Sequence, residues 1–395
     1  MRLDLLGTLA ALTAASTCLA QPDDLDRAAE LELSRGGWAP AARGAGETPR
    51  TFRPAPIAGE NGASLRVTGF IHYRWFNNFR QQQDSDNDFT TGTEFRRVRT
   101  VFQGRLNDRV AYKIEGEANN GVSRLFEAWA SYRIDDNWRL KLGQFRNHFS
   151  RVRQTSATAL QLVDRAILNY EVQPQMFIRT QGVELRYRDD EQLFAVMLNE
   201  GSRGVNTTFT DDEVDYAFTV RYDRRLAGPF DPTSPLSSPR GSAFAAMVGA
   251  GFHYQEGEDA VGERAAWTVD GSVLGDGWSV HAAYEGHSAE DLNAIGEPEL
   301  INGFFVQGGV FVTDRLELAA RYEHAWTSDD DDTLSLITLG FNYFIYGQAL
   351  KLSSDVVIGL EPVSGTFARR ADGILIDEPG EDGQIAWRTQ IQLVF

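Results

Sequence analysis

Arginine is the residue type in this chain whose spacing most clearly predicts a chemical role. Four arginines gather in one stretch, with Asp164 and Glu171 as the nearby acids. They are Arg146, Arg151, Arg153 and Arg165. A guanidinium group keeps its positive charge and presents paired donors in one plane, which fits an oxyanion such as phosphate. The stretch is therefore a candidate anion-binding segment.

A second basic set occupies alternating positions of strand-like segments, and consists of Arg97, Arg99, Arg105, Arg139 and Lys141. Residues two apart on a strand point to the same face, so these side chains should line one wall. Residues 64–204 hold 21 Lys and Arg against 17 Asp and Glu, whereas residues 205–395 hold 11 against 31. The formal net charge of −18 therefore hides a basic first half.

The elements that must position these residues are short strands. We expect sixteen, over residues 64–80, 93–105, 109–119, 124–134, 137–145, 177–188, 191–200, 213–226, 243–254, 264–274, 277–287, 300–312, 315–325, 334–346, 349–360 and 384–395. Their connections alternate between short, turn-like pieces and long ones, as in a barrel with turns at one end and loops at the other. Two connections break the alternation: 227–242 is long and Pro-rich, and 120–123 is short.

The two faces of these strands differ in polarity. In the last one, Phe395, Leu393, Ile391 and Trp387 alternate with a mostly polar set, which indicates lipid on one side and water on the other. Charged residues form one face of segments 95–106, 109–118, 137–142 and 214–223. Burying such charges in a soluble core would cost several kcal/mol each. Sixteen strands instead leave a water-filled lumen. The pattern predicts an all-β fold, a transmembrane antiparallel β-barrel over residues 64–395.

The N-terminal region predicts export. Arg2, the apolar run Leu5 to Ala15 and a small-residue stretch are typical of a signal peptide over residues 1–20. Residues 21–63 are rich in Ala, Gly, Pro and charge, and we expect a flexible periplasmic lead-in. The only cysteine, Cys18, lies in the predicted signal, so a disulfide scaffold and a thiolate metal site are excluded. A lipoprotein anchor at Cys18 is the alternative.

Several motifs in residues 93–188 resemble the phosphate-selective porin O and P family. They are the Arg-rich Phe95-Arg-Arg-Val-Arg-Thr-Val-Phe-Gln-Gly104, the acidic Tyr112-Lys-Ile-Glu-Gly-Glu117, Phe126-Glu-Ala-Trp-Ala-Ser-Tyr-Arg133, Leu140-Lys-Leu-Gly-Gln-Phe145 and a long following loop. The resemblance implies a trimer of barrels with the long third loop folded into the lumen. The chain differs from the family in having only three lysines, and in Arg146 following Gln144-Phe145 where the family usually has Pro.

Together these features predict an outer-membrane porin for passive diffusion of small hydrophilic solutes, above all anions such as phosphate. We expect the loop arginines to lie at the narrowest point, and Arg97, Arg99 and Lys141 further from it. The alternative for these arginines is that they pair with carboxylates such as Glu115 and Glu117 and only brace the wall. A structural or surface-binding barrel with a closed pore is the alternative function, and an outer-membrane enzyme is a third.

The same prediction sets the compartment and the partners. The protein should reside in the outer membrane of a Gram-negative cell. Its partners should be outer-membrane lipid, small anionic solutes, further copies of itself in a homotrimer, and the barrel-assembly machinery, which would recognise the terminal Phe395. We expect no catalytic residue, cofactor, metal or nucleic acid.

Overall fold

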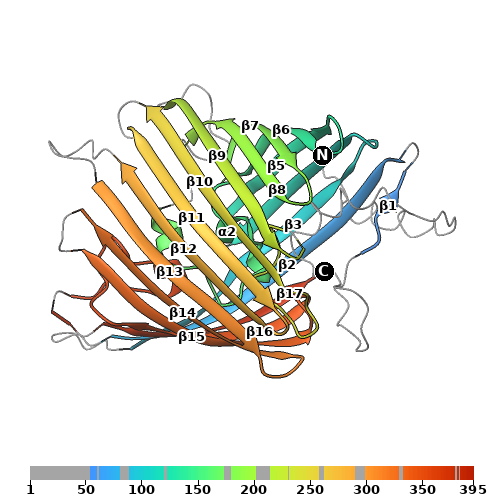
Figure 1. Cartoon of the computed structure of the whole chain (residues 1–395). Helices are drawn as coiled ribbons and strands as arrows, with labels where there is room; N and C mark the ends of the chain where they lie inside the picture. The colour runs from blue at the N-terminus through green and yellow to red at the C-terminus, as the bar shows by residue number, and fades with distance from the viewer. Residues whose placement is uncertain are drawn as a thin grey trace, which may run out of the picture. The chain divides into compact units, whose positions relative to one another are not determined.

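Sixteen long strands hydrogen bond to one another in chain order in the computed structural model, and each is antiparallel to its neighbours. They are β2 (Ser64–Phe79), β3 (Phe89–Arg105), β4 (Val110–Asn119), β5 (Val122–Arg133), β6 (Trp138–Arg146), β7 (Arg179–Arg188), β8 (Gln192–Asn199), β9 (Val214–Ala227), β10 (Ala245–Gly257), β11 (Arg264–Gly275), β12 (Trp278–Ala289), β13 (Glu299–Phe311), β14 (Leu316–Thr327), β15 (Thr333–Tyr346), β16 (Leu350–Gly359) and β17 (Ile385–Val394). Figure 1 shows them side by side and oblique to one another. A two-residue strand, β1 (Ile57–Ala58), pairs with β2.

The structure describes residues 54–59, 62–80, 89–119, 122–172, 179–201, 214–229, 231–257, 262–289, 299–328, 332–378, 380–381 and 383–395. The predicted signal peptide and most of the predicted lead-in lie outside them. Helical turns are short: α2 (Arg151–Gln154), α3 (Leu168–Glu171) and the 3₁₀ turns η2 (Ala157–Ala159) and η5 (Arg370–Asp372). Among the described residues, no helix is long and apolar enough to cross a membrane.

The sheet closes on itself because β17 pairs with β2. The predicted all-β fold, a closed antiparallel barrel of sixteen strands, is therefore confirmed. The largest difference in bounds is at β3, which begins at Phe89 instead of 93. Thr90 and Thr91 extend the pairing there opposite Asn78 and Asn77, since threonine fits an extended backbone well. The short connections again alternate with long ones, and the two predicted exceptions remain: the long 228–244 connection and the short 120–121 connection.

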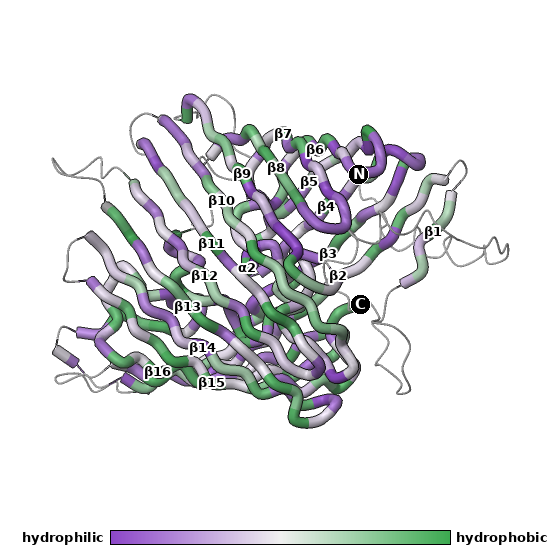
Figure 2. The backbone as a smooth tube through the Cα atoms, in the orientation of Figure 1, coloured by the Kyte–Doolittle hydropathy of each residue, from purple (hydrophilic) through white to green (hydrophobic). Residues whose placement is uncertain are grey.

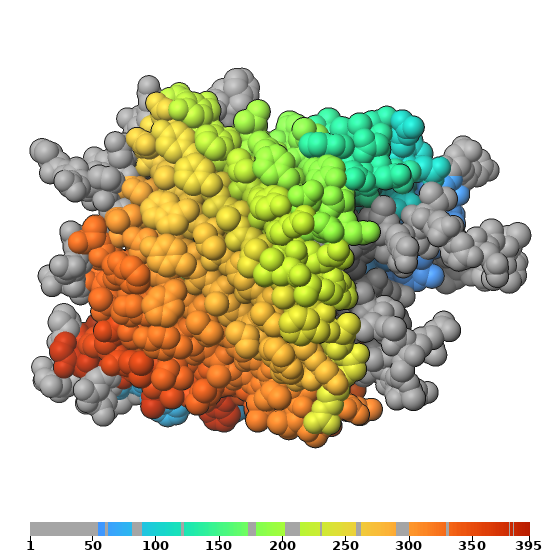
Figure 3. Space-filling model, in the orientation of Figure 1, coloured from blue at the N-terminus to red at the C-terminus, as the bar shows by residue number. Residues whose placement is uncertain are grey.

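Side chains alternate across the wall, apart from bulges such as that at Arg96, where His72 pairs with Arg97 and Tyr73 with Phe95. In β17, Trp387, Ile391 and Leu393 are exposed, whereas Arg388 and Gln392 are buried. Figure 2 shows hydrophobic and hydrophilic positions following one another along the strands, and Figure 3 shows outward side chains covering one face continuously. The apolar outer face is the surface that hydrocarbon would contact, and the predicted two-sided pattern is confirmed.

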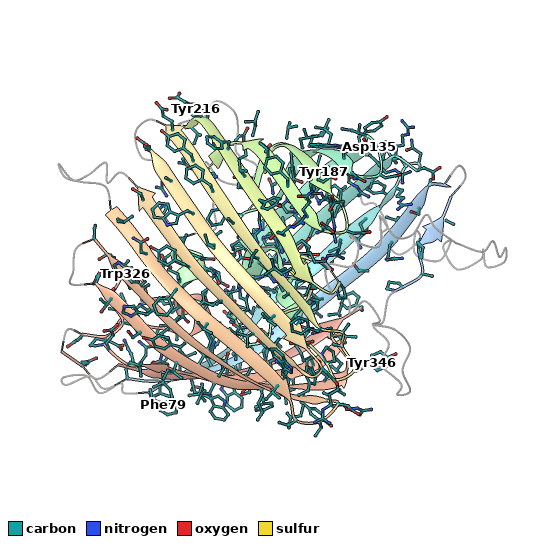
Figure 4. The ribbon with its side chains drawn as sticks, viewed as in Figure 1. Phe79, Asp135, Tyr187, Tyr216, Trp326 and Tyr346 are labelled. Atoms are coloured by element: carbon teal, nitrogen blue, oxygen red, sulfur yellow. The ribbon has the colours of Figure 1, made fainter. Side chains whose placement is uncertain are left out.

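Large aromatic side chains mark both ends of the strands (Figure 4). Phe79, Tyr216 and Trp326 lie next to the long connections, whereas Tyr187 and Tyr346 lie next to the short turns. Aromatic rings at two levels of a barrel match the girdles that sit at the two membrane–water interfaces. The two sets of rings lie at opposite ends of the tilted strands, so the barrel presents an apolar band between two aromatic rims. We call the end that carries the short turns the short-turn rim.

The seam between β17 and β2 ends on Phe395. Its backbone N–H donates to the Gly69 carbonyl (2.9 Å), and the Gly69 N–H donates back to the Phe395 carbonyl (2.7 Å). A Cβ on Gly69 would lie 2.9 Å from the Phe395 ring and 2.6 Å from the Arg99 carbonyl, so only glycine admits this approach. The last residue thus completes the closure of the barrel.

Deleting Phe395 should lower the yield of folded barrel, because two backbone hydrogen bonds of about 1 kcal/mol each and the ring contact are lost at the seam. Phe395→Ala keeps the backbone pair and should have a smaller effect. Phe102→Ala, which removes an outward ring from β3, is the matched control. The measurement is the fraction of protein that migrates as an unheated, SDS-resistant form. Wild-type yield of the deletion variant would contradict the assigned role.

Candidate functional site

The connection between β6 and β7 is the longest described segment that approaches the inner face of the wall. We call its residues 147–172 the inner loop; nearly all are buried. Its carbonyls accept hydrogen bonds from inward side chains: Lys351 Nζ donates to Leu160 (2.9 Å) and Asn342 Nδ2 to Gln161 (2.6 Å). Gln392 Nε2 donates to the Thr158 carbonyl (3.0 Å). Strands distant in sequence therefore hold the loop in place.

An apolar cluster fills the space between the inner loop and strands β11 to β17. Phe149, Val152, Ile167 and Leu168 of the loop contribute to it. The wall contributes Ala266, Ala283, Ile301, Phe305, Ala325, Leu334, Leu336, Val357 and Ala386. These wall residues alternate with exposed outward ones, so they belong to the inner face. The inner face of this half of the wall is therefore mixed: the apolar side chains on which the loop buries its own lie among buried charged ones such as Asp270, Glu317 and Arg388.

The wall also leaves room for the loop where it comes closest. At Gly251 of β10, an added Cβ would lie 2.2 Å from the Phe149 carbonyl oxygen. No side chain larger than hydrogen fits there unless the loop moves. Gly251 therefore provides the space that the start of the inner loop needs. Its position in a strand pattern does not reveal this role.

The centre of the site is a carboxylate of the inner loop surrounded by arginines of the wall. Asp164 accepts a hydrogen bond from Arg74 Nη2 (2.9 Å) and lies 3.4 Å from Arg97 Nη2. Arg96 Nε lies 4.0 Å from the same carboxylate. The Tyr170 hydroxyl also donates to Asp164 (2.5 Å). We call Arg74, Arg96 and Arg97 the basic cluster.

The electrostatics of Asp164 follow from this arrangement. Burial alone would raise the pKa of its carboxyl, but the guanidinium groups of Arg97, Arg74 and Arg96 hold that pKa well below its usual range. The carboxylate therefore stays ionised throughout the physiological pH range. It neutralises one of the three positive charges around it and joins the loop to β2 and β3.

A second carboxylate reaches the basic cluster from the connection between β16 and β17. Asp372, in η5, lies 3.1 Å from Arg96 Nη2 and 3.7 Å from Arg74 Nη1. In the same connection, Arg369 Nη1 donates to Glu171 at the end of the inner loop (2.9 Å). Burial raises the pKa of Glu171 although Arg369 opposes the shift. Two connections from opposite parts of the sequence thus meet at the basic cluster.

The predicted loop arginines make contacts that brace the loop. Arg146 Nη1 donates to the Gln154 carbonyl (2.7 Å), and Arg165 Nη2 donates to the Thr155 carbonyl (2.6 Å). The Arg153 guanidinium lies over the Tyr170 ring, 4.3 Å from its centroid. The fourth member, Arg151, donates through Nη2 to the Ser234 hydroxyl (3.2 Å), outside the loop.

The predicted wall residues divide into two groups. Arg97 Nη2 lies 3.4 Å from Asp164, because the inward position of a β3 side chain brings it to the inner loop. That Arg97 lies further from the narrowest point than the loop arginines stays a prediction. Arg99 donates to Glu117 (2.5 Å) and Glu115 (3.1 Å), the two carboxylates that the bracing interpretation named. Lys141 Nζ lies 4.2 Å from the Trp129 ring centroid.

The remaining predicted residues lie towards the short-turn rim. Arg105 pairs in register with Ser64 at the start of β2. Arg139 of β6 stands directly between Arg133 of β5 and Arg186 of β7. Like charges directly opposite one another destabilise a sheet, so negative charge, from the protein or from a bound anion, should offset the repulsion within this row of three arginines.

Sequence reasoning missed several residues that the structure places in the site. Arg74 is fully buried, and Arg388 binds Asp355 through two donors at 2.7 and 2.8 Å. The alternation of β2 carried a signal for Arg74, because Tyr73 and Trp75 face outward. Nothing in the pattern could have indicated Asp372, which lies in an irregular connection.

Asp164→Asn should destabilise the folded barrel by about 3–5 kcal/mol, because it leaves the arginines that face Asp164 without their partner. The folded-state pKa of Asp164 is depressed, so its contribution is complete above the unfolded value of about 3.9 and is lost only as pH falls through the depressed value. Denaturant unfolding at pH 7 and pH 5 should give the same difference. Glu191→Gln, which removes the partner of the exposed Arg224, is the control and should cost under about 1 kcal/mol. A difference that vanishes at pH 5 would contradict this assignment.

Comparisons with known proteins extend these observations. The model of the family described as phosphate-selective porin O and P matches residues 66–227, from within β2 to the end of β9. A search of curated proteins finds no match. An anion-selective porin from Comamonas acidovorans has a similar structure, with 13% sequence identity, a TM-score of 0.62, and coverage of 84% of this chain and 100% of the porin.

Two further solved structures resemble the barrel. The outer membrane channel DcaP of Acinetobacter baumannii is 15% identical, with a TM-score of 0.57 and coverage of 87% of this chain and 100% of DcaP. In-vitro folded OmpT, an outer membrane protein of Vibrio cholerae, is 14% identical, with a TM-score of 0.56 and coverage of 86% and 100%. At these identities the likeness concerns the fold. The family resemblance predicted from the motifs is nevertheless confirmed over residues 66–227, which match the phosphate-selective porin O and P family.

Proposed function

We propose that the protein is an outer-membrane channel through which small hydrophilic solutes diffuse, with a preference for anions. The observation that carries the anion preference is the basic cluster: Arg74, Arg96 and Arg97 all face the single carboxylate of Asp164. Asp372 and Glu94 supply two further negative charges, 3.1 and 3.8 Å from Arg96. The positive balance beside the inner loop comes from Arg165, whose guanidinium donates to the Val152 and Thr155 carbonyls and adds a fourth positive charge near Asp164. Fixed positive charge in a narrow passage is the usual means of selecting anions.

Arg97 is the residue best placed to contact a passing anion. Its Nη2 makes only long hydrogen bonds to Asp164, at 3.4 and 3.5 Å. Its Nη1 is buried and makes no hydrogen bond to the residues that the structure describes. A buried donor without a partner costs free energy, which an oxyanion or water at this position would recover. The row of Arg133, Arg139 and Arg186 supports the proposal, because it places further positive charge on the inner face.

The solute class follows from these donors. Guanidinium groups bind carboxylates and phosphates alike, so we propose small oxyanions in general, with phosphate as one member. The family description and the anion-selective porin from Comamonas acidovorans support this direction. The barrel and the family indicate the outer membrane and a channel in preference to an enzyme.

Assembly is a further part of the proposal. We propose export by residues 1–20, insertion in outer-membrane lipid by the barrel-assembly machinery through Phe395, and association into a homotrimer. A structure of Vibrio cholerae OmpT described as a trimer form is among the similar structures, which supports the trimer.

A structural barrel with a closed pore is the second candidate. The apolar cluster favours it, because the inner loop packs tightly against half of the wall. The burial of inward charged residues such as Arg99, Glu184 and Arg221 favours it too. Single-channel conductance in a planar bilayer distinguishes the two functions, since a closed barrel gives no steps at all.

Arg97→Gln should lower the anion-to-cation permeability ratio by roughly two- to fivefold, which corresponds to about 0.4–1 kcal/mol of lost attraction. Reversal potentials in a salt gradient measure this ratio. Arg224→Gln, at an exposed position paired with Glu191, is the matched control and should leave the ratio unchanged. If Arg97→Gln and Arg224→Gln give identical reversal potentials, the cluster only braces the loop.

A further inference from the structure

The connection between β9 and β10 is far longer than its neighbours at the short-turn rim. Residues 228–244 form it, whereas residues 276–277 suffice to connect β11 with β12. Its described part follows the rim: Gly277 N–H donates to the Pro239 carbonyl (3.1 Å), and Arg240 Nη2 donates to the Val312 carbonyl (2.7 Å). We call residues 231–241 the strap. It extends from β9 past the β11–β12 turn to the β13–β14 turn.

The middle of the strap turns towards the inside of the wall. Leu236 is buried and belongs to the same apolar cluster as Phe149 of the inner loop. The Ser237 hydroxyl donates to Glu317 Oε2 (2.8 Å), a fully buried carboxylate on the inner face of β14. The other Glu317 oxygen accepts from Gln161 Nε2 of the inner loop (2.7 Å). One wall carboxylate thus binds the strap and the inner loop together.

Arg151 forms a second link between the two segments. Its backbone N–H donates to Asp270 of the wall (3.3 Å). Its guanidinium donates to the Asp231 carbonyl (3.3 Å) and to the Ser234 hydroxyl (3.2 Å). The residue that the sequence suggested as a solute contact therefore connects the loop to the wall through its backbone and to the strap through its side chain.

The strap is built to keep its shape. Pro232, Pro235 and Pro239 each fix one backbone angle and so lower the freedom of the free segment. The Asp231 carboxylate accepts hydrogen bonds from the Thr233 N–H (3.0 Å) and hydroxyl (2.8 Å), which forms a local turn. A long connection with such internal order is typical of a segment with a defined position.

We infer that the strap is a second narrow point of the channel, at the short-turn rim, held against the inner loop by Arg151 and Glu317. The inference rests on the proposed channel function. A solute that has passed the basic cluster then passes the strap before it leaves. The two narrow points act in series, so each adds its own resistance to the flow of ions.

Replacing residues 230–241 with Asn-Gly tests the inference. Ala227 pairs with Ala246, and residues 228–229 and 242–245 then flank the Asn-Gly turn in a shortened connection between β9 and β10. Single-channel conductance should rise about twofold if both narrow points contribute equally, while anion preference persists because the basic cluster is intact. Ser242→Ala, whose hydroxyl makes no hydrogen bond among the described residues, is the control for handling and yield.

Each result of this measurement decides one question. If the wild-type protein conducts and the replacement leaves the conductance unchanged, the inference is overturned but the proposed channel function is not. A wild type without conductance overturns the proposed open channel and the inference that rests on it; conductance of the replacement alone would then identify the strap as the plug of a closed barrel. If neither protein conducts, both are overturned.

A cysteine reporter covers the case in which the replacement fails to fold. In an otherwise wild-type chain, Ser234→Cys places a thiol on the strap where the side chain is half-buried. A negatively charged methanethiosulfonate reagent should reduce conductance stepwise and lower anion preference. Asp136→Cys, exposed on the β5–β6 turn, is the matched control and should react without effect. Labelling of Ser234→Cys that leaves the current unchanged places the strap outside the ion path.

Discussion

A ring of sixteen strands encloses more space than its own inward side chains can fill, and the rest of this structure depends on how that space is occupied. The inner loop occupies part of that space, and the ion pairs at Asp164 attach the loop to the wall. One carboxylate of the inner loop faces Arg74, Arg96 and Arg97 on the wall, and its position fixes how deep the loop lies. The apolar cluster then follows, because a loop held at that depth places Phe149 and Ile167 against β11 to β17. Hydrogen bonds from Lys351, Asn342 and Gln392 to loop carbonyls hold the same loop against the wall.

The barrel could be predicted because alternation is a local property. Each strand shows its two faces in its own residues, and short turns such as those near Asp135 and Asp276 carry strong composition signals. The last strand is the clearest example: outward Trp387 and Leu393 alternate with inward Arg388 and Gln392. The alternation of a strand can therefore be recognised without knowing which strand pairs with it.

The site could be predicted only in part, because its contacts join distant segments. The sequence identified Arg97 and Arg99 as inward and basic, and it named Glu115 and Glu117 as possible partners of Arg99. It could not show that Asp164 meets Arg97, or that Asp372 comes from the opposite end of the chain. Likewise, the apolar cluster uses inward wall residues as small as Ala266 and Ala325, and small residues give little periodic signal.

Bracing and selection use the same arginines in this barrel. The contacts of Arg146, Arg151 and Arg165 hold segments in place, and Arg165 also adds a fourth guanidinium group to the three that face Asp164, Asp372 and Glu94. A pore that is held open or narrowed by ion pairs gains selectivity when the positive partners outnumber the negative ones. The charge balance at each position, and not the number of arginines, therefore distinguishes a selecting residue from a bracing one.

The contacts of the inner loop also bear on the order of assembly. Arg151 contacts Asp270, which lies 119 residues further along the chain, and the Thr158 carbonyl accepts from Gln392, which lies 234 residues further along. The loop is synthesised long before either partner, and Gln392 belongs to the strand that closes the ring. Docking of the loop therefore cannot be completed until the last strand has paired. A protease site within residues 147–172 would become protected at that moment, and its protection would time the closing of the barrel.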